Sequence, residues 1–170
     1  ENARKLIPEI DKEYGKRFGV EHGGHVEKYR CEDADLIILS MGTIASEARL
    51  AVDNLRSQGQ KVGVARIRVF RPFPKDEILK TVKDTQMLTI IDRQASYGME
   101  GPLHTEVKAS LYGHEDTPPA AGFIAGLGGR DVTTRDIEKM VNKSMQYLRA
   151  GRVEKEVEWI GLREGPPGGH

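Results

Sequence analysis

The sequence predicts a three-layer α/β/α protein, in which helices cover both faces of a mostly parallel β-sheet. Two observations predict this fold. Continuous apolar runs of strand length alternate with segments of helical periodicity four times along the 170 residues. The apolar runs lack the alternation of a half-exposed strand, which is typical of parallel strands buried on both faces.

The predicted strands are apolar runs that end at glycine, proline or charged residues. They cover residues 36–42, 61–70, 86–92 and about 122–127, and residues 25–35 form a further extended segment and a turn. Right-handed crossovers between parallel strands place the carboxyl ends of these strands on one side. We therefore expect the residues that follow the strands to share one edge of the sheet.

Helical spacing of apolar residues predicts the remaining elements. The predicted helices cover residues 1–19, 43–59, 75–85, 101–113 and 130–151. Gly59 is expected to stop the second helix, and Pro102 suits the first turn of the fourth. Pro8 lies inside the first helical pattern and is expected to kink it or to mark its first turn.

These elements predict one α/β domain with a flank at each end. Residues 29–150 form the domain, residues 1–28 an amino-terminal helix and linker, and residues 151–170 an extended tail that is expected to be disordered from Gly165. The chain begins within a helical pattern, without a methionine or a signal peptide. We expect it to be excised from a longer polypeptide; a cloning choice and a mature terminus stay open as alternatives.

Composition argues against several classes of function. Lysine plus arginine and aspartate plus glutamate number 26 each, so the chain lacks the basic surplus of a nucleic-acid-binding protein. No run of about 18 apolar residues predicts a membrane span. The single cysteine, Cys31, excludes an internal disulfide and a multi-cysteine zinc or iron–sulfur site, and it fits a cytoplasmic location.

Cys31 and the histidines offer little chemistry by themselves. Glu32 and Asp33 beside Cys31 are expected to raise the pKa of its thiol, which makes it a poor nucleophile. The histidines are scattered, and no pair has the spacing of metal ligands; they are His22, His25, His104, His114 and His170. We therefore predict neither a catalytic residue nor a metal site.

The first candidate site is the turn at residues 40–47, which joins a predicted strand to a predicted helix. Free backbone N–H groups at a helix start favour an anion, and the hydroxyls of Ser40 and Thr43 would add donors. However, the dinucleotide fingerprint needs three glycines, only Gly42 is present, and a phosphate-binding lysine is missing. The simpler interpretation is a structural turn in which Thr43 caps the helix.

The second candidate is the segment Arg-Pro-Phe-Pro at residues 71–74, which follows a predicted strand. Its two prolines stiffen the chain and present Arg71 and Phe73 at the carboxyl edge of the sheet. Arginine beside an aromatic residue is common in protein interfaces and in phosphate sites. A packed turn is the structural alternative.

The third candidate is a polar stretch after the strand at residues 86–92. It contains Asp92, Arg93, Gln94, Ser96 and Tyr97. Gly98 and Gly101 permit tight turns or close approach by a partner. A triad of Ser96, His104 and Asp92 is conceivable, but the nucleophile-elbow motif is absent and we expect His104 inside the following helix.

The fourth candidate is the glycine-rich turn at residues 126–133. Its three glycines suggest a close backbone crossing, and Thr133 with Asp136 resembles a capping box at the next helix start. Arg130 and Asp131 are expected at the same edge of the sheet. An anion at this helix start and a cap with a surface ion pair are both compatible with the pattern.

None of the four turns offers a complete catalytic set, and all of them offer arginine, aspartate, serine or aromatic side chains. Such a polar edge is typical of a docking surface, because arginine and aromatic residues are enriched at the centres of interfaces. The residues that we predict to form this interface are Arg71, Phe73, Arg93, Ser96, Tyr97 and Arg130.

Several motifs resemble a known family. The runs EDADLIILSMGT, AVDNLRSQGQKVGVARIRVFRPFP, IIDRQASYGMEGPLHTEV and AGLGGRDVT are similar to the second domain of pyruvate:ferredoxin oxidoreductases. The resemblance covers about residues 29–140, and it corresponds to the carboxyl-terminal part of the alpha subunit in multi-subunit enzymes. RPFP is shared with other 2-oxoacid:ferredoxin oxidoreductases, whereas GLGGRDVT points to the pyruvate type. A wider relation to the carboxyl-terminal domain of transketolase agrees with the three layers.

The resemblance implies a non-catalytic part of a cytoplasmic enzyme that oxidatively decarboxylates a 2-oxo acid with coenzyme A and reduces ferredoxin. It implies that thiamine diphosphate, Mg and iron–sulfur clusters are held by other domains or subunits, since the sequence lacks their binding motifs. Those domains and subunits are the expected partners, with ferredoxin an indirect one. Nucleic acid and membrane are not expected as partners.

Two alternatives stay open at this point. One is a free-standing nucleotide- or anion-binding module that uses Gly42 and the turn at residues 126–129. The other is the same domain of a branched-chain or indole-type 2-oxoacid:ferredoxin oxidoreductase.

Overall fold

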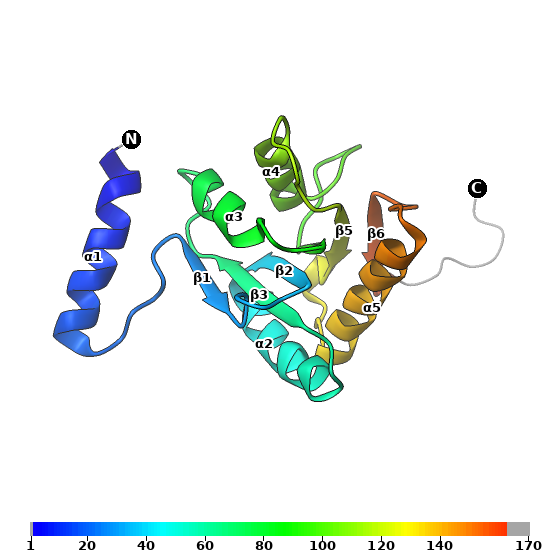
Figure 1. The fold of residues 1–170 in the computed structure, drawn as a ribbon, viewed down its shortest axis with the longest axis horizontal. Coiled ribbons are helices and arrows are strands. Elements are labelled where there is room, and N and C mark those ends of the chain that lie inside the picture. The colour runs from blue at the N-terminus through cyan, green and yellow to red at the C-terminus, as the bar shows by residue number, and fades with distance from the viewer. Residues whose placement is uncertain (1, 163–170) are drawn as a thin grey trace.

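The computed structural model describes residues 2–162, and these form a single sheet with helices on both sides (Figure 1). The helices are α1 (Asn2–Phe18), α2 (Gly42–Ser57), α3 (Lys75–Val82), α4 (Pro102–Leu111) and α5 (Thr134–Ala150). The strands are β1 (Val26–Tyr29), β2 (Leu36–Met41), β3 (Val62–Ile67), β4 (Met87–Asp92), β5 (Ala120–Ala125) and β6 (Val157–Ile160). A short 3₁₀ turn, Leu127–Gly129, follows β5.

The six strands pair in the order β1-β3-β2-β4-β5-β6. Strand β1 runs antiparallel to β3 at one edge, and all other neighbours are parallel. The predicted fold class, a mostly parallel sheet in a three-layer α/β/α arrangement, is therefore confirmed. The order reverses direction at β2, which has β3 on one side and β4 on the other.

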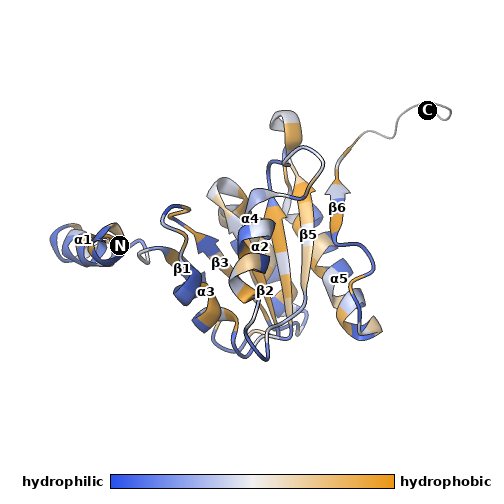
Figure 2. Ribbon diagram, turned by 90° about the horizontal axis from the view of Figure 1, so that it is seen from above, coloured by the Kyte–Doolittle hydropathy of each residue, from blue (hydrophilic) through white to orange (hydrophobic). Residues whose placement is uncertain are grey.

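Two apolar clusters hold helices against the sheet. Helices α2 and α5 pack on one face over residues such as Ile38, Ile91 and Phe123. Helices α3 and α4 pack on the opposite face over Leu39 and Ile90. Figure 2 shows the central strands as the most hydrophobic part of the ribbon. Their burial on both faces explains the continuous apolar runs of the sequence.

The predicted strands and helices all form, but several boundaries differ. Strand β3 ends at Ile67 and not at residue 70, and α5 begins at Thr134 and not at residue 130. Strand β5 begins at Ala120 and ends at Ala125, earlier than predicted, because it pairs with β4 from Ala120 onward. Helix α2 begins at Gly42 with Met41 at the cap position and no capping side chain. The prediction that Thr43 caps this helix was therefore wrong, since Thr43 already lies within its first turn.

The two flanks contribute to the sheet. Strand β1 begins at Val26, and β6 lies in the segment predicted as an extended tail, where it pairs with β5. The division at residues 29 and 150 therefore separates two edge strands from the sheet to which they belong. Predicted disorder from Gly165 lies outside the described residues. Helix α1 runs beyond edge strand β1, with Pro8 inside it and past its first turn (Figure 1).

Candidate interaction edge

A shallow hollow lies between the carboxyl ends of β2 and β4, where the strand order reverses. Its volume is about 320 Å³, and its lining residues are Ser40, Met41, Gly42, Thr43, Ile44, Ile91, Arg93 and Gln94. Open α/β sheets bind ligands at such a reversal. The hollow thus brings together the first and third candidate sites of the sequence.

Ser40 does not present its hydroxyl to this hollow as a free donor. The side chain is fully buried, and its Oγ donates a hydrogen bond to the carbonyl of Ile91 at 3.0 Å. This bond joins β2 to β4 next to the reversal. Gly42 adopts a positive φ of 59° where the chain turns into α2, a conformation that favours glycine.

Arg93 links the loop after β4 to the turn after β5. Its Nη2 donates to the carbonyl of Arg130 at 3.3 Å. Gly126 leaves room for this side chain, because a Cβ atom there would lie 2.8 Å from Arg93 Nε. Both arginines are exposed. The structure therefore joins two of the predicted interface residues at one edge.

Asp92 is buried, although the sequence suggested a side chain at an open edge. Its two carboxylate oxygens accept the backbone N–H groups of Leu103 and His104, both at 3.0 Å. A Cβ atom on Gly101 would lie 2.2 Å from this carboxylate, so glycine is required there by space. Burial raises the pKa of the Asp92 carboxyl, and the two hydrogen bonds oppose that shift. Asp92 thus anchors the start of α4.

His104 lies in α4, as predicted, and is buried in a cluster of ionisable groups whose outer members are partly exposed. Its Nδ1 is 3.2 Å from Glu100 Oε2, without the geometry of a hydrogen bond, and Glu100 is itself buried. Lys108 Nζ lies 2.7 Å from the same Glu100 oxygen and also pairs with Glu156. Burial lowers the pKa of His104, Glu100 opposes the shift, and Lys108 adds to it. Burial therefore favours the neutral form of the imidazole.

The conceivable triad is absent from this arrangement. Asp92 meets the backbone of His104 and not its ring, and His104 Nδ1 faces Glu100. Ser96 contributes backbone contacts to the loop: its N–H donates to the Glu100 carbonyl at 3.1 Å and its carbonyl accepts from Met99 at 3.0 Å. Glu100 and its cluster were missed by the sequence reasoning; the four-residue spacing to His104 was the only local signal.

Arg71 and Phe73 occupy the turn after β3, which contains a cis peptide bond between Arg71 and Pro72. The Arg71 guanidinium pairs with Glu106 of α4 and lies 4.3 Å from the ring centroid of Phe70. Phe73 packs edge-on against Phe70, with centroids 5.6 Å apart, and borders the apolar cluster beneath α3 and α4. This turn is therefore packed, while Arg71 stays largely exposed.

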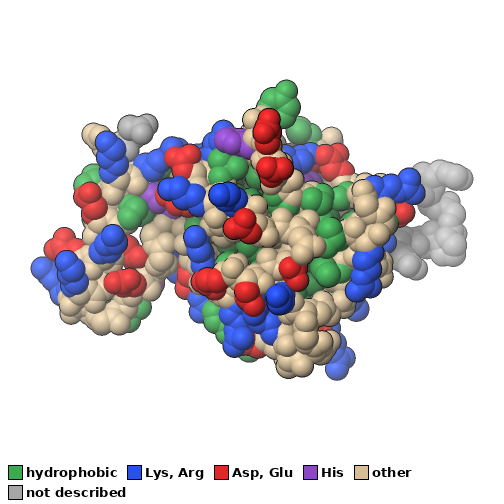
Figure 3. All heavy atoms as spheres, in the orientation of Figure 1, with side chains coloured by type: hydrophobic (Ala, Val, Ile, Leu, Met, Phe, Trp, Pro, Cys, Tyr) green, Lys and Arg blue, Asp and Glu red, His purple; other side chains and the backbone are tan. Residues whose placement is uncertain are grey.

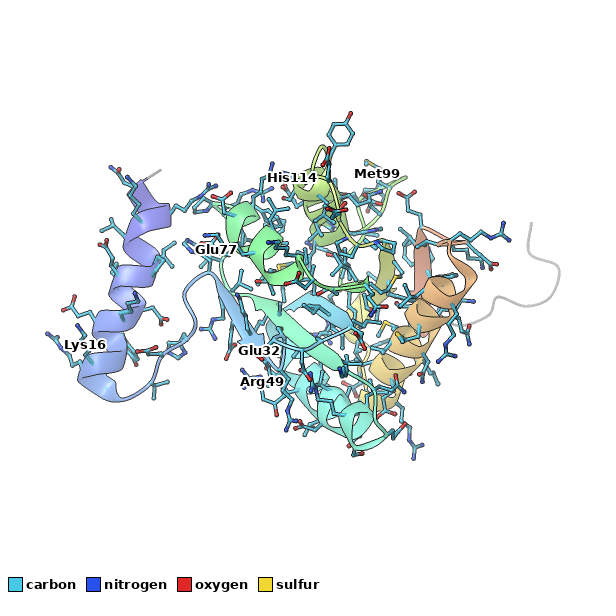
Figure 4. All side chains as sticks on the ribbon, in the orientation of Figure 1. Lys16, Glu32, Arg49, Glu77, Met99 and His114 are labelled. Atoms are coloured by element: carbon cyan, nitrogen blue, oxygen red, sulfur yellow. The ribbon has the colours of Figure 1, made fainter. Side chains whose placement is uncertain are left out.

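The loop at residues 93–101 carries the most exposed apolar groups of this edge. Tyr97 is fully exposed and Met99 is 61% exposed. Gly98 has a φ of 70°, which lets the chain reverse between them. Figure 4 shows Met99 on this loop, on the side of the molecule away from Lys16 of α1. Exposed aromatic and methionine side chains are enriched in protein interfaces.

The fourth candidate is a helix cap. Thr133 and Asp136 form the predicted capping box: the hydroxyl of Thr133 accepts the N–H of Asp136, whose carboxylate accepts the N–H of Thr133. Hydrogen bonds to Thr133 lower the pKa of Asp136. The cap satisfies donors at the start of α5 that an anion would otherwise meet. Arg130 and Asp131 lie exposed beside it.

Cys31 and the possible metal ligands show no reactive arrangement in the described residues. Burial raises the pKa of the Cys31 thiol to about 11, and Glu32 adds to the shift. Within residues 2–162, no three His, Cys, Asp or Glu side chains gather as a metal site. Among the same residues, no helix is long and apolar enough to cross a membrane.

Comparison with known proteins identifies the family. The family described as pyruvate:ferredoxin oxidoreductase core domain II matches residues 34–137, from the start of β2 into α5. The chain belongs to this family. The match spans the hollow, the buried Asp92 cap and the loop at residues 93–101.

Curated relatives of this domain II chain are subunits of 2-oxoacid oxidoreductases. It is 40% identical over 96% of its length to ketoisovalerate oxidoreductase subunit VorA of Pyrococcus horikoshii and 41% identical over 96% to pyruvate synthase subunit PorA of Pyrococcus abyssi. The chain spans 41% of the length of each. Nearly equal identity to both types leaves the predicted preference for pyruvate a prediction.

Two solved structures share the fold of domain II. A chain of 2-oxoglutarate:ferredoxin oxidoreductase from Magnetococcus marinus superposes with a TM-score of 0.58 at 19% identity, over 81% of this chain and 23% of that one. An inactive split-gene transketolase superposes with a TM-score of 0.54 at 19% identity, over 68% and 39%. These likenesses confirm the predicted transketolase-like architecture.

Proposed function

We propose that this chain is a non-catalytic assembly domain of a thiamine-diphosphate-dependent 2-oxoacid:ferredoxin oxidoreductase that makes or uses an acyl-coenzyme A. It braces neighbouring domains or subunits through the carboxyl edge of its sheet. The interface residues are those predicted from the sequence: Arg71, Phe73, Arg93, Ser96, Tyr97 and Arg130. Pyruvate, and hence acetyl-coenzyme A, is the first substrate to test, and 3-methyl-2-oxobutanoate is the second.

The types of side chain exposed at the carboxyl edge of the sheet are the main support for the proposal. Its exposed groups, Arg93, Tyr97 and Met99, are of the types enriched at interface centres. The carboxylate and imidazole groups that could take part in catalysis are instead buried, where they contact other parts of the domain. Asp92 holds the start of α4, and His104 is buried beside Glu100.

The residues of this chain do not fit the cofactors that the family implies. An iron–sulfur cluster takes several cysteine thiolates, and the sequence has one cysteine, whose thiol is protonated at neutral pH. Within the described part, no acidic cluster offers Mg ligands. We therefore assign thiamine diphosphate, Mg and the clusters to other parts of the complex.

The test compares the chain alone with the complex that contains the complete subunit. Ferredoxin or viologen reduction that depends on a 2-oxo acid and coenzyme A is expected from the complex only. Turnover by the purified chain would contradict the proposal. Calorimetric titration of the chain with thiamine diphosphate, coenzyme A, NAD and ATP is expected to show no micromolar binding.

The competing function is an anion- or nucleotide-binding module. The hollow beside the uncapped start of α2 favours it, with Arg93 at its rim. Only one fingerprint glycine, Gly42, is present at this turn. Micromolar binding of NAD or ATP that disappears in Arg93→Ala would establish this alternative in place of the assembly role.

A further inference from the structure

Helix α1 carries an apolar stripe that the described part of the chain leaves half exposed. Leu6, Ile10, Tyr14 and Phe18 follow one another at four-residue intervals, so they line one side of the helix. Their side chains are between 45% and 60% exposed, and none of the 17 residues of α1 is buried. An apolar stripe of this kind normally faces a protein core.

Few interactions hold α1 to the domain. Arg4 Nη2 donates to the carbonyl of Phe73 at 3.2 Å, and the carboxylate of Asp11 accepts the N–H groups of His22 and Gly24. A groove of about 310 Å³ separates the helix from the segment after β3, and two residues of the apolar stripe, Ile10 and Tyr14, line it. Its lining includes Ile7, Ile10, Tyr14, Arg68 and Val69.

This arrangement leaves α1 without the packing that stabilises most helices. An isolated helix of about 15 residues is marginal in water even with favourable residues. Tyr14 and Phe18 stack with ring centroids 4.6 Å apart, which covers part of each ring but buries neither. The groove and the stripe together form a surface that one further apolar element would complete.

We propose that the stripe of α1 docks against an apolar surface of the polypeptide that precedes this domain in the same subunit. This inference rests on the proposed function. The relatives are longer, with this chain spanning 41% of their length and matching their carboxyl-terminal part. The stripe is therefore a second contact surface, in addition to the carboxyl edge of the sheet.

The position of α1 supports the preceding polypeptide as the segment that covers the stripe. The Arg4–Phe73 hydrogen bond places the amino-terminal end of α1 beside the predicted interface edge. A polypeptide that precedes α1 would join the helix at this end, the end that carries Leu6 of the stripe. A polypeptide that docks on the stripe could then also contact the predicted interface edge, so that the two contact surfaces adjoin.

The remainder of α1 does not resemble a lipid-binding helix. Such helices carry a predominantly basic polar face. Figure 3 shows both acidic and basic side chains on α1. The charged residues of this helix include Glu9, Lys12, Glu13, Lys16 and Arg17. Lys16 projects away from the sheet (Figure 4). This mixture fits a helix with one side on protein and the other in water.

Hydrogen exchange of the α1 amides tests the proposal. In the purified chain, the amides of α1 are expected to exchange quickly, because few interactions with the rest of the domain oppose local opening of the helix. In the complex that contains the complete subunit, they are expected to exchange at least about tenfold more slowly. The loop at residues 93–101 is followed in the same experiment and reports separately on the proposed edge.

A matched pair of double variants separates docking from folding. The double variant Ile10→Gln with Phe18→Gln is expected to abolish the protection of the α1 amides in the complex. It is also expected to lower the amount of assembled complex that is recovered by at least about tenfold. Lys5→Gln with Lys16→Gln introduces the same residues on the exposed polar face and is expected to leave both readouts unchanged. Circular dichroism of each purified chain checks that the domain remains folded.

Each other outcome overturns the proposal in a distinct way. Protection of residues 93–101 without protection of α1 refutes the docking of α1 and leaves the assembly function standing. Protection of neither segment in an assembled complex refutes both. Protection of α1 in the purified chain that grows with concentration assigns the stripe to a second copy. Protection that appears only with anionic phospholipid vesicles assigns it to a membrane surface.

Discussion

Asp92, the last residue of β4, accepts the backbone N–H of His104 in α4 at 3.0 Å, and its other oxygen accepts that of Leu103. A strand residue thus caps a helix that begins ten residues later at Pro102, with Gly101 offering no side chain. This tertiary cap fixes both ends of the loop at residues 93–101. The position of the loop at the proposed interaction edge therefore depends on a buried carboxylate.

Removing this cap is expected to destabilise the domain. Asp92→Ala leaves two buried N–H groups without their acceptor, which costs about 1–3 kcal/mol of unfolding free energy. Urea denaturation of the chain measures the change. Asp131→Ala removes an exposed carboxylate at the same edge and is expected to shift the unfolding free energy by less than about 0.5 kcal/mol. Equal effects of the two variants would show that the cap is energetically irrelevant.

The buried His104 predicts a dependence of stability on pH. Because burial lowers its pKa, the unfolded chain binds the proton more readily than the folded one. The stability that this group contributes is present above the unfolded pKa of about 6.5 and is lost as the pH falls below it. Asp92 has a raised pKa and acts in the opposite sense, in the more acidic range where carboxylates titrate.

Urea denaturation between about pH 7.5 and pH 5.5 checks this prediction. As the pH is lowered, the unfolding free energy is expected to decrease by at most about 1.4 kcal/mol per pH unit. His104→Gln is expected to flatten that slope, whatever its effect on the absolute stability. His114→Gln, at an exposed position, serves as the control. A slope that persists in His104→Gln would assign the pH dependence to another group.

Gly122 of β5 leaves space for the His104 ring. A Cβ atom at Gly122 would lie 2.3 Å from His104 Nδ1, closer than packed atoms approach. Gly122→Ala is therefore expected to destabilise the chain by about 1–3 kcal/mol. Thermal or urea unfolding of Gly122→Ala, His104→Ala and the double variant tests the cause. If the contact is responsible, the double variant is more stable than the sum of the single effects predicts.

Arg93→Ala tests the carboxyl edge of the sheet as an interface. Association of the domain within the complex is expected to weaken by about 1–3 kcal/mol, because arginine at an interface centre contributes strongly. Stability of the isolated chain is expected to change by less than about 0.5 kcal/mol, since the side chain is exposed and makes one long hydrogen bond to Arg130. Analytical ultracentrifugation and thermal melting measure the two quantities.

The outcomes for Arg93→Ala distinguish three roles. Weaker assembly with unchanged melting supports the interface. Loss of stability with normal assembly of the folded protein shows that Arg93 braces its own domain through Arg130. If neither quantity changes, this part of the edge is a solvated surface.

Local signals were sufficient for much of the fold. The runs at β2, β3 and β4 are mostly apolar because both faces of those strands are covered, so the pattern indicated a parallel sheet. The capping box of Thr133 and Asp136 was also predictable from the sequence, because both partners lie within one helical turn. Such features depend on residues close together in the sequence.

The edge strands and the contacts of Asp92 were harder to predict from the sequence. Strands β1 and β6 each have four residues and are only partly buried, so they carry a weak pattern and owe their state to pairing with β3 and β5. Asp92 resembled an exposed polar residue because its partners lie eleven and twelve positions away.

The sequence by itself determined the three-layer class, the central strands and the family resemblance, because apolar periodicity and short motifs are properties of neighbouring residues. Only the tertiary structure decided which polar groups are available to a partner. It buried Asp92 and His104, engaged the hydroxyl of Ser40, and left Arg93 and Tyr97 exposed. The physical reason is that burial and hydrogen bonding depend on which distant segments meet. A carboxylate or a hydroxyl satisfies a helix start or a strand carbonyl only once the sheet has formed.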